Sequence, residues 1–165
     1  DDPDFADAYL QATCKFFLGT GSGIYILSSM FGRPVAYANM LPYGECGRLP
    51  HEIVIFKNSR DVNTGNLIPY GEMISRGVDS DWLTEEEISL LEAQGIEFVD
   101  NTSDDIRILV LEMNERLDGT WKTNPEDKQL QEQFVKISPA RHFNSNEFPG
   151  RVGAAFLRKN RLLLT

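Results

Sequence analysis

The chain has 165 residues, of which 41 % are hydrophobic, 10 % aromatic and 25 % charged. That composition is typical of one globular domain, and it excludes a disordered or low-complexity chain. Asp and Glu outnumber Lys and Arg by 25 to 16, so the net charge is −9 at pH 7. We therefore expect no nucleic-acid partner, because binding to duplex phosphates depends on cationic side chains.

The number of cysteines and the length of the apolar runs indicate the cellular compartment in which we expect the protein. Cys14 and Cys46 are too few for a disulfide framework, and we expect both to be reduced thiols. No apolar run approaches the ~20 residues that a membrane-spanning helix needs. The acidic start, residues 1–4, is unlike the basic beginning of a signal peptide. We therefore expect a cytoplasmic protein without a membrane span.

The first thirty residues predict a helix, a strand, a glycine-rich turn and a second helix. Apolar side chains at helical spacing indicate a helix over residues 5–12. The apolar run 15–18 indicates a strand, which stops at the turn Gly19–Gly23. Apolar side chains then recur at helical spacing over residues 24–31.

The second helix is expected to lead into a second strand. Ile24, Leu27 and Phe31 recur at i, i+3 and i+7, which is helical spacing. Pro34 cannot continue a helix, and Val35–Ala38 is typical of a strand. Strand, turn, helix and strand make a βαβ unit, which predicts a parallel sheet.

Residues 41–80 contain many glycines and prolines and predict a single strand, Glu52–Phe56. A long irregular segment in a compact domain tends to be functional. This one follows the end of a predicted strand, which is where open α/β sheets bind ligands.

The C-terminal half predicts four helices and one strand. They are a helix opening at the capping box Thr84–Glu87, a strand over 96–99, a helix opening at 101–105, a helix opening at Asn124–Pro125, and a last helix over about 150–163. The alternation predicts an α/β fold, a Rossmann-like parallel sheet of few strands flanked by helices. Because such sheets usually have more strands, we expect residues 1–165 to form one partial domain of a longer parent chain.

The glycine-rich turn is the strongest chemical signal, but three named motifs fail there. A dinucleotide fingerprint needs Gly or Ala at the sixth position from Gly19, where Ile24 stands. A P-loop needs a lysine, and none closes this turn. A nucleophile elbow needs glycine two residues before and after Ser22, but Thr20 and Ile24 occupy those positions.

A general anion site remains compatible with the turn. Glycines allow a tight turn, and the helix after it directs free N–H groups and a positive dipole at the loop. The hydroxyls of Thr20 and Ser22 add donors, so a phosphate or diphosphate suits this position. A purely structural interpretation is equally open, in which Ser22 caps the helix and the glycines serve the turn.

Six segments carry a family resemblance, in order over most of the chain. They are 16–23, 31–35, 39–42, 96–102, 113–121 and 150–157. Together they resemble the C-terminal part of a bacterial family of surface-carbohydrate glycosyltransferases. Segment 16–23 is also similar, more distantly, to the donor-domain loop of heptosyltransferases, where an Asp-Ser/Thr-Gly turn holds the donor diphosphate. Gly21 stands in place of that acid.

The resemblance implies the GT-B architecture, in which two Rossmann-like domains face each other across a cleft. The C-terminal domain binds a nucleoside-diphosphate sugar, and the sugar passes to a hydroxyl of a glycan acceptor in polysaccharide synthesis. The expected donor-binding residues are Thr20, Gly21, Ser22, Gly23, Asn39 and Lys57. We expect no metal and no cofactor, because N–H groups and cations can stabilise the leaving diphosphate.

Lys57 is the preferred cation for the diphosphate because it directly follows a predicted strand. Arg48 and Arg60 are the other cations near the expected strand ends. In GT-B enzymes the general base usually lies in the N-terminal acceptor domain, which we expect to be outside residues 1–165. We therefore assign no catalytic residue and expect the isolated chain to be inactive.

Other interpretations stay open beside the transferase. One is a non-catalytic nucleotide or sugar-phosphate binding module, and another is a small serine hydrolase that uses Ser22 with His51 and Glu52. Asp79–Asp81 and Asp2–Asp4 match an Asp-x-Asp pattern that holds a divalent cation in another class of glycosyltransferase. A zinc site is not expected, because the Cys and His residues lack paired spacing.

Overall fold

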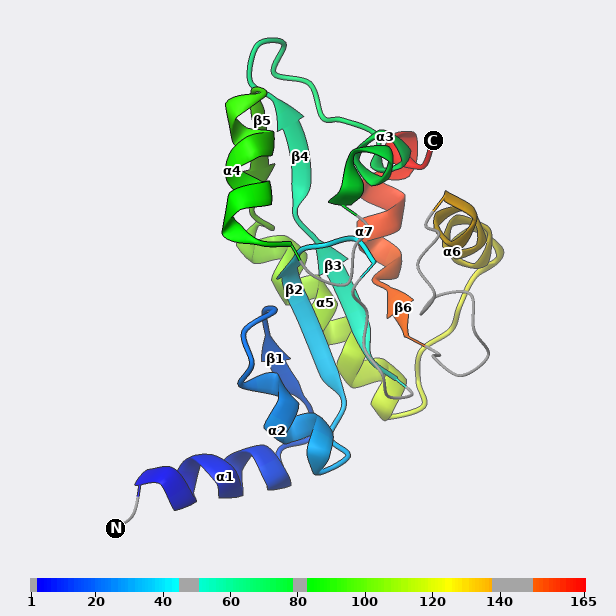
Figure 1. Cartoon of the computed structure of the whole chain (residues 1–165). Coiled ribbons are helices and arrows are strands. Elements are labelled where there is room, and N and C mark those ends of the chain that lie inside the picture. The colour runs from blue at the N-terminus through cyan, green and yellow to red at the C-terminus, as the bar shows by residue number, and fades with distance from the viewer. Residues whose placement is uncertain (1–2, 45–50, 79–82, 138–149) are drawn as a thin grey trace.

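The computed structural model describes residues 3–44, 51–78, 83–137 and 150–165. At its centre lies a four-stranded parallel sheet in the order β1-β2-β3-β6 (Figure 1). Its strands are β1 (Phe17–Gly19), β2 (Val35–Met40), β3 (Ile53–Phe56) and β6 (Arg151–Val152). The predicted α/β fold, a Rossmann-like parallel sheet of few strands flanked by helices, is confirmed.

The two central strands form the core of the sheet. All four residues of β3 and five of the six residues of β2 are buried. Parallel strands covered by helices on both faces have this nearly continuous apolar sequence, because neither face meets water. The edge strand β1 is only partly buried, and Leu18 faces solvent.

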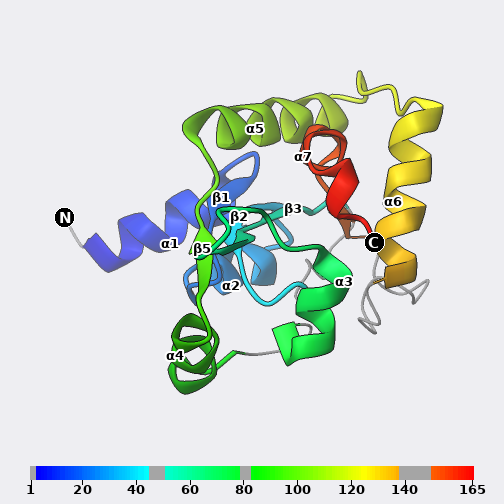
Figure 2. The same ribbon diagram turned by 90° about the horizontal axis from the view of Figure 1, so that it is seen from above.

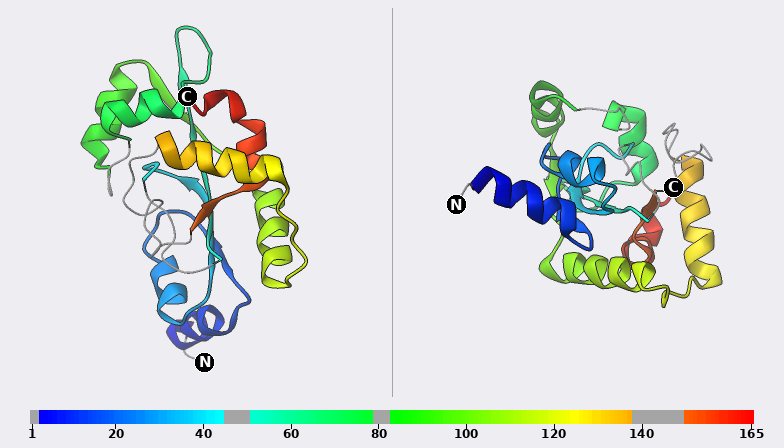
Figure 3. Two further views of the ribbon diagram at one scale, coloured as in Figure 1. Left: turned by 90° about the vertical axis from the view of Figure 1, so that its right-hand side faces the viewer. Right: turned by 90° about the horizontal axis from the view of Figure 1, so that it is seen from below.

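Helices lie on both faces of the sheet. Figure 2 shows α5 (Ser103–Leu117) on one face, with α2 (Tyr25–Met30) and α3 (Tyr70–Met73) on the other. Next to α5 lies α7 (Ala154–Lys159), and α6 (Pro125–Ile137) packs against α7. The first helix, α1 (Pro3–Thr13), contacts α2 and extends away from the body of the molecule (Figures 1 and 3).

A two-stranded antiparallel sheet extends the structure beyond β3. Its strands are β4 (Asn58–Asp61) and β5 (Ile96–Val99), and only Lys57 separates β3 from β4. The prediction of a strand over 96–99 is confirmed, whereas β4 was not predicted because its sequence is entirely polar. Connecting elements are η1 (Ile74–Val78), α4 (Glu85–Ala93) and η2 (Arg161–Leu163).

The sequence signals for helix starts are accurate in the middle of the chain. Both Thr84 and Thr102 cap their helices in complete capping boxes, with Glu87 and Asp105 as the reciprocal partners. In each box the hydroxyl accepts a backbone N–H and the carboxylate accepts the N–H of the capping residue. These starts are local interactions, so the sequence alone predicts them.

The predicted last helix, 150–163, is wrong at its beginning. Arg151 and Val152 form the fourth parallel strand, paired with Ile53 and Val54, and α7 begins only at Ala154. A two-residue strand carries no periodic pattern of its own. Its conformation is set by the neighbouring strand, to which the Gly153 N–H also donates at Val54 O, 2.9 Å away.

The orientation of α2 does not follow its apolar spacing. Ile24 and Phe31 are exposed, whereas Ser28 is buried. Tyr25 faces the sheet and packs edge-on against Tyr37, with ring centroids 5.1 Å apart. A six-residue helix has less than two turns, so one aromatic contact outweighs the apolar spacing that the sequence shows.

Candidate functional site

The glycine-rich segment links the edge strand to α2 at the carboxyl end of the sheet. Gly19 is the last residue of β1 and Tyr25 is the first of α2, which confirms the predicted strand–turn–helix order. The turn lies over the end of the neighbouring strand, because a Cβ built on Gly21 would lie 3.6 Å from Cε of Met40. Residues 20–23 therefore belong to the edge at which open α/β sheets bind ligands.

Neither hydroxyl of the turn is used to hold the fold. Thr20 and Ser22 are exposed, and their hydroxyls have no hydrogen-bond partner among the described residues. The capping residue of α2 is Ile24, which makes no side-chain cap. The interpretation of Ser22 as a helix cap is therefore wrong, and both hydroxyls remain available to a ligand.

Asn39, the residue before the last of β2, is in the left-handed region, with φ of 55°. Its backbone N–H donates to Oδ1 of Asn101 at 2.7 Å, and its own Oδ1 accepts the backbone N–H of Asn101 at 2.6 Å. The Nδ2 of Asn101 donates in turn to Phe56 O at 2.7 Å. Asn39 thus joins the ends of β2 and β3 to the start of α5, and its side-chain oxygen already has a protein partner.

Lys57 lies at the end of β3, on the same edge. Its backbone N–H donates to Met40 O at 3.1 Å, and its Nζ lies 2.8 Å from Oδ1 of Asp100. Only 29 % of the Lys57 side chain is exposed, whereas Asp100 is 68 % exposed. The Lys57 ammonium therefore pairs with a well-hydrated carboxylate. An exposed ion pair of this kind is weak, so an anionic ligand can compete with Asp100 for the ammonium.

The structure brings the six predicted donor-binding residues to one edge. Residues 20–23 follow β1, Asn39 lies next to the last residue of β2, and Lys57 follows β3; these three strands are neighbours in the sheet. Arg60 lies in β4, which follows β3 in the chain but belongs to the two-stranded sheet, and it pairs with Glu97 at 3.3 Å. Arg48 lies outside the described residues. The arrangement offers hydroxyl donors, backbone N–H groups and one ammonium, which are the groups that bind a phosphate.

Sequence reasoning missed Asp100 and Asn101 as parts of this edge. Both follow β5, at the start of α5, more than forty residues after Lys57 in the chain. A polar Asp-Asn pair after a strand is the only local signal, and it does not reveal which side chains it meets. Only the packing of α5 against β2 and β3 brings the pair to Asn39 and Lys57.

The hydrolase alternative is not supported by the geometry. Ser22 follows the carboxyl end of β1, whereas His51 and Glu52 precede the amino end of β3. Because these strands are parallel, the three residues lie at opposite edges of the sheet. Among the described residues, no three His, Cys, Asp or Glu side chains cluster as metal ligands. The Asp79–Asp81 pattern lies outside them, as does Asp2.

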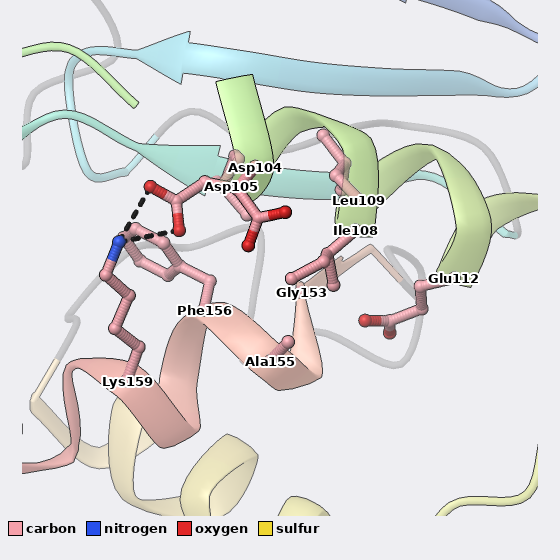
Figure 4. A pocket seen from close by; sticks show the side chains of 10 residues that line it. Asp104, Asp105, Ile108, Leu109, Glu112, Gly153, Ala155, Phe156 and Lys159 are labelled. Atoms are coloured by element: carbon pink, nitrogen blue, oxygen red, sulfur yellow. Dashed lines mark hydrogen bonds and ion pairs between the residues drawn. The ribbon is translucent and has the colours of Figure 1, made fainter. Parts of the chain in front are cut away.

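A cavity of about 190 Å³ lies between α5, α7 and β3 (Figure 4). At its rim the Nζ of Lys159 contacts both carboxylate oxygens of Asp105, at 2.7 and 2.8 Å. Deeper in, one oxygen of the buried Glu112 accepts the N–H of Ala154 at 2.8 Å. The Asp105 carboxylate takes part in the capping box of α5 and pairs with Lys159, and the Glu112 carboxylate accepts an N–H at the start of α7. The cavity is therefore a packing feature rather than a reactive site.

Comparison with known proteins identifies no relative. No family model, no curated protein and no solved structure matches the chain. Within the described ranges, no helix is long and apolar enough to cross a membrane.

Proposed function

We propose that this chain is the donor-binding domain of a GT-B-type glycosyltransferase, and that the turn 20–23 holds the diphosphate of a nucleotide sugar. The observation that carries the proposal is the place of this turn. It follows a strand of a parallel sheet at the carboxyl edge, with two unused hydroxyls, and Lys57 follows the second strand along. The sequence resemblance to surface-carbohydrate glycosyltransferases supports the same assignment.

The chemistry of sugar transfer explains why such an edge is useful. When the bond between the sugar and the diphosphate breaks, negative charge develops on the leaving oxygen. The hydroxyls of Thr20 and Ser22, the N–H groups of the turn and the Lys57 ammonium can balance that charge without a metal ion. Asn39 would act as a positioning residue, because its oxygen already accepts a backbone N–H of Asn101.

A second domain is part of the proposal, and the exposed apolar residues support it. Eight exposed large hydrophobic side chains lie in α1, β1, α2 and the residues beside them: Phe5, Tyr9, Leu10, Leu18, Ile24, Ile26, Met30 and Phe31. Large exposed apolar patches commonly mark protein interfaces. We propose that an N-terminal acceptor domain covers these side chains, so that the glycan acceptor meets the donor between the two domains.

Titration calorimetry with uridine diphosphate tests the donor site. The wild-type chain is expected to bind, and Gly21→Val to bind about tenfold more weakly, because its branched side chain projects from the turn that holds the phosphates. The ordinary 3.6 Å spacing between a Cβ at Gly21 and Met40 predicts that the variant still folds. Equal affinities in the two proteins, or no binding by the folded wild type, would overturn the proposal.

Two lysine variants distinguish a direct contact between Lys57 and the ligand from a general effect of the protein's net charge on binding. Lys57→Ala and Lys15→Ala each remove one ammonium and one ion pair, with Asp100 and Asp118 respectively. Lys15 precedes β1 and so lies at the opposite edge of the sheet. Only Lys57→Ala is expected to weaken binding, most strongly at low ionic strength. An equal loss from both variants would indicate a general charge effect and contradict the assignment of Lys57.

Turnover tests the two-domain part separately. The isolated chain is expected to transfer no sugar from a nucleotide sugar, because the acceptor side of the cleft is missing. A transfer rate from this chain that Gly21→Val abolishes would contradict that expectation. Binding without turnover by a natural protein that contains both domains would instead favour the non-catalytic binding module.

A further inference from the structure

A second cavity, of about 290 Å³, lies at the amino end of β6, away from the turn 20–23. Its walls come from the end of α5, the first half of α6, β6 and the start of α7. The lining residues that matter here are Arg116, Thr123, Lys128, Gln131 and Arg151. Arg116, Lys128 and Arg151 line the cavity together with the acidic side chains of Asp127 and Glu132, in a chain whose net charge is −9.

Arg151 is the unusual member of this group. Its Nε is buried and has no hydrogen-bond partner, and no described carboxylate pairs with its guanidinium. Burial lowers the pKa of Arg151, and the charge of Arg116 lowers it further, while Glu112 acts in the opposite direction. A partly buried cation without a partner is costly, so a fold that retains one needs a compensating contact.

The acids near the cavity are already committed to other cations. One oxygen of Glu112 accepts hydrogen bonds from Nε and Nη2 of Arg116 at 2.9 and 2.7 Å, and the other accepts the Ala154 N–H. Asp127 is buried and pairs with Arg158. Arg151 is therefore the arginine of this cavity with which no described carboxylate forms an ion pair, although the charge of Glu112 acts on it.

The remaining polar groups of the cavity are suited to an anion. Gln131 uses its Oε1 to accept the Val152 N–H at 3.0 Å, which leaves its NH₂ group as a donor. The Thr123 hydroxyl accepts from the indole of Trp121 at 3.2 Å, so its own proton is free to donate. Lys128 is 76 % exposed at the rim, 3.9 Å from Glu132, so solvent reaches the cavity from the α6 side.

We propose that this cavity binds a phosphate group, with Arg151 as its principal ligand and Arg116, Gln131 and Lys128 beside it. A guanidinium presents parallel N–H donors that match two oxygens of one phosphate. Because Arg116 and Lys128 already face Glu112 and Glu132, the charge available to the anion comes mainly from Arg151. The volume lies at the lower end of small-molecule sites, which suits inorganic phosphate or a small phosphorylated molecule.

This inference is independent of the proposed transferase function. Arg151 pairs with Ile53, the first residue of β3, and therefore lies at the amino edge of the sheet. The turn 20–23 lies at the carboxyl edge. Ligands at the two places perturb different residues, so failure of one proposal leaves the other standing.

The test is a titration of the full chain with inorganic phosphate at constant ionic strength, followed by backbone amide chemical shifts. Saturable shifts are expected at Thr123, Gln131 and Val152. Arg151→Gln is expected to weaken binding by about tenfold or more, because each hydrogen bond to a charged group contributes about that factor. Arg107→Gln removes an exposed arginine from the outer face of α5 and serves as the matched control.

Thermal unfolding distinguishes a ligand-binding role of Arg151 from a structural role. Without phosphate, Arg151→Gln is expected to melt at the wild-type temperature or above it, since an unpaired cation has been removed. With phosphate, only the wild type and Arg107→Gln are expected to gain stability. The proposal is overturned if phosphate causes no saturable shifts, or if Arg151→Gln binds phosphate as tightly as the wild type. Sulfate binding of equal strength would show a general oxyanion site and would overturn the assignment to phosphate.

Discussion

Asn39 and Asn101 exchange hydrogen bonds in both directions, each side-chain oxygen accepting the backbone N–H of the other, at 2.6 and 2.7 Å. This pair joins β2 to the start of α5 across 62 residues of chain. It lies at the same edge as the turn 20–23, so it holds two walls of the proposed donor site in a fixed relation.

Two replacements of Asn39 are expected to distinguish the stability that its side-chain hydrogen bonds provide from the cost of its left-handed backbone conformation. Asn39→Gly removes the side chain but tolerates φ of 55°, and we expect a loss of about 1–3 kcal/mol in unfolding free energy from the unsatisfied Asn101 N–H. Asn39→Ala adds the cost of a left-handed alanine, about 1 kcal/mol more. Urea unfolding measures both. Equal stability of the two variants would show that the conformation at position 39 relaxes.

Asp105 predicts a pH-dependent contribution to stability. Burial alone would raise its pKa, but hydrogen bonds from Lys159 and Thr102, together with the Lys159 charge, hold it below its ordinary value. A carboxylate with a lowered folded-state pKa stabilises the fold above its unfolded pKa and loses that effect as the pH falls through the folded value. Asp105→Asn should therefore lower the urea midpoint at pH 7, and the difference should shrink below about pH 4.

Asp104→Asn is the matched control for that measurement. It removes the same charge from the same first turn of α5, but Asp104 is 66 % exposed and pairs only with Arg107 on its own helix. A smaller loss than for Asp105→Asn is expected at pH 7. An equal loss would mean that the helix dipole, rather than the contact with Lys159, provides the stabilisation.

A buried polar contact beneath β4 should also be measurable. The hydroxyls of Tyr43 and Ser59 lie 2.8 Å apart, both residues are fully buried, and burial raises the pKa of Tyr43 despite this hydrogen bond. Tyr43→Phe leaves the Ser59 hydroxyl without this partner, and we expect a loss of about 1–2 kcal/mol. The double variant with Ser59→Ala should lose less than the sum of the single variants. Strict additivity in chemical denaturation would show that the hydroxyls do not interact.

Gly153 is expected to tolerate no side chain. A Cβ there would lie 2.9 Å from Cγ2 of Ile55, a fully buried residue of β3. Gly153→Ala should cost about 1–3 kcal/mol through overpacking between β6 and β3. Gly23→Ala is the control, because its Cβ would meet only Ile26 at 4.0 Å. Similar unfolding free energies for the two variants would contradict the close approach of the strands.

Much of the chain could be predicted because the signals are local. Capping boxes at Thr84 and Thr102 start α4 and α5, and the apolar runs of β2 and β3 indicate buried parallel strands. The turn after Gly19 was likewise predicted to join a strand to a helix. The capping boxes and the turn depend on interactions within a few residues, and the continuous apolar runs of β2 and β3 are themselves the signal of strands buried on both faces.

The structure alone decided the features that depend on distant partners. The polar β4 is a strand because it pairs with β5, and Arg151–Val152 is a strand because β3 lies beside it. The exposure of Ile24 follows from the contact of Tyr25 with Tyr37. The sequence by itself determined the α/β class and the glycine-rich turn at a strand end. Packing decided which side chains surround that turn and left Arg151 without an ion pair to a described acid, because these contacts join residues that are remote in the chain.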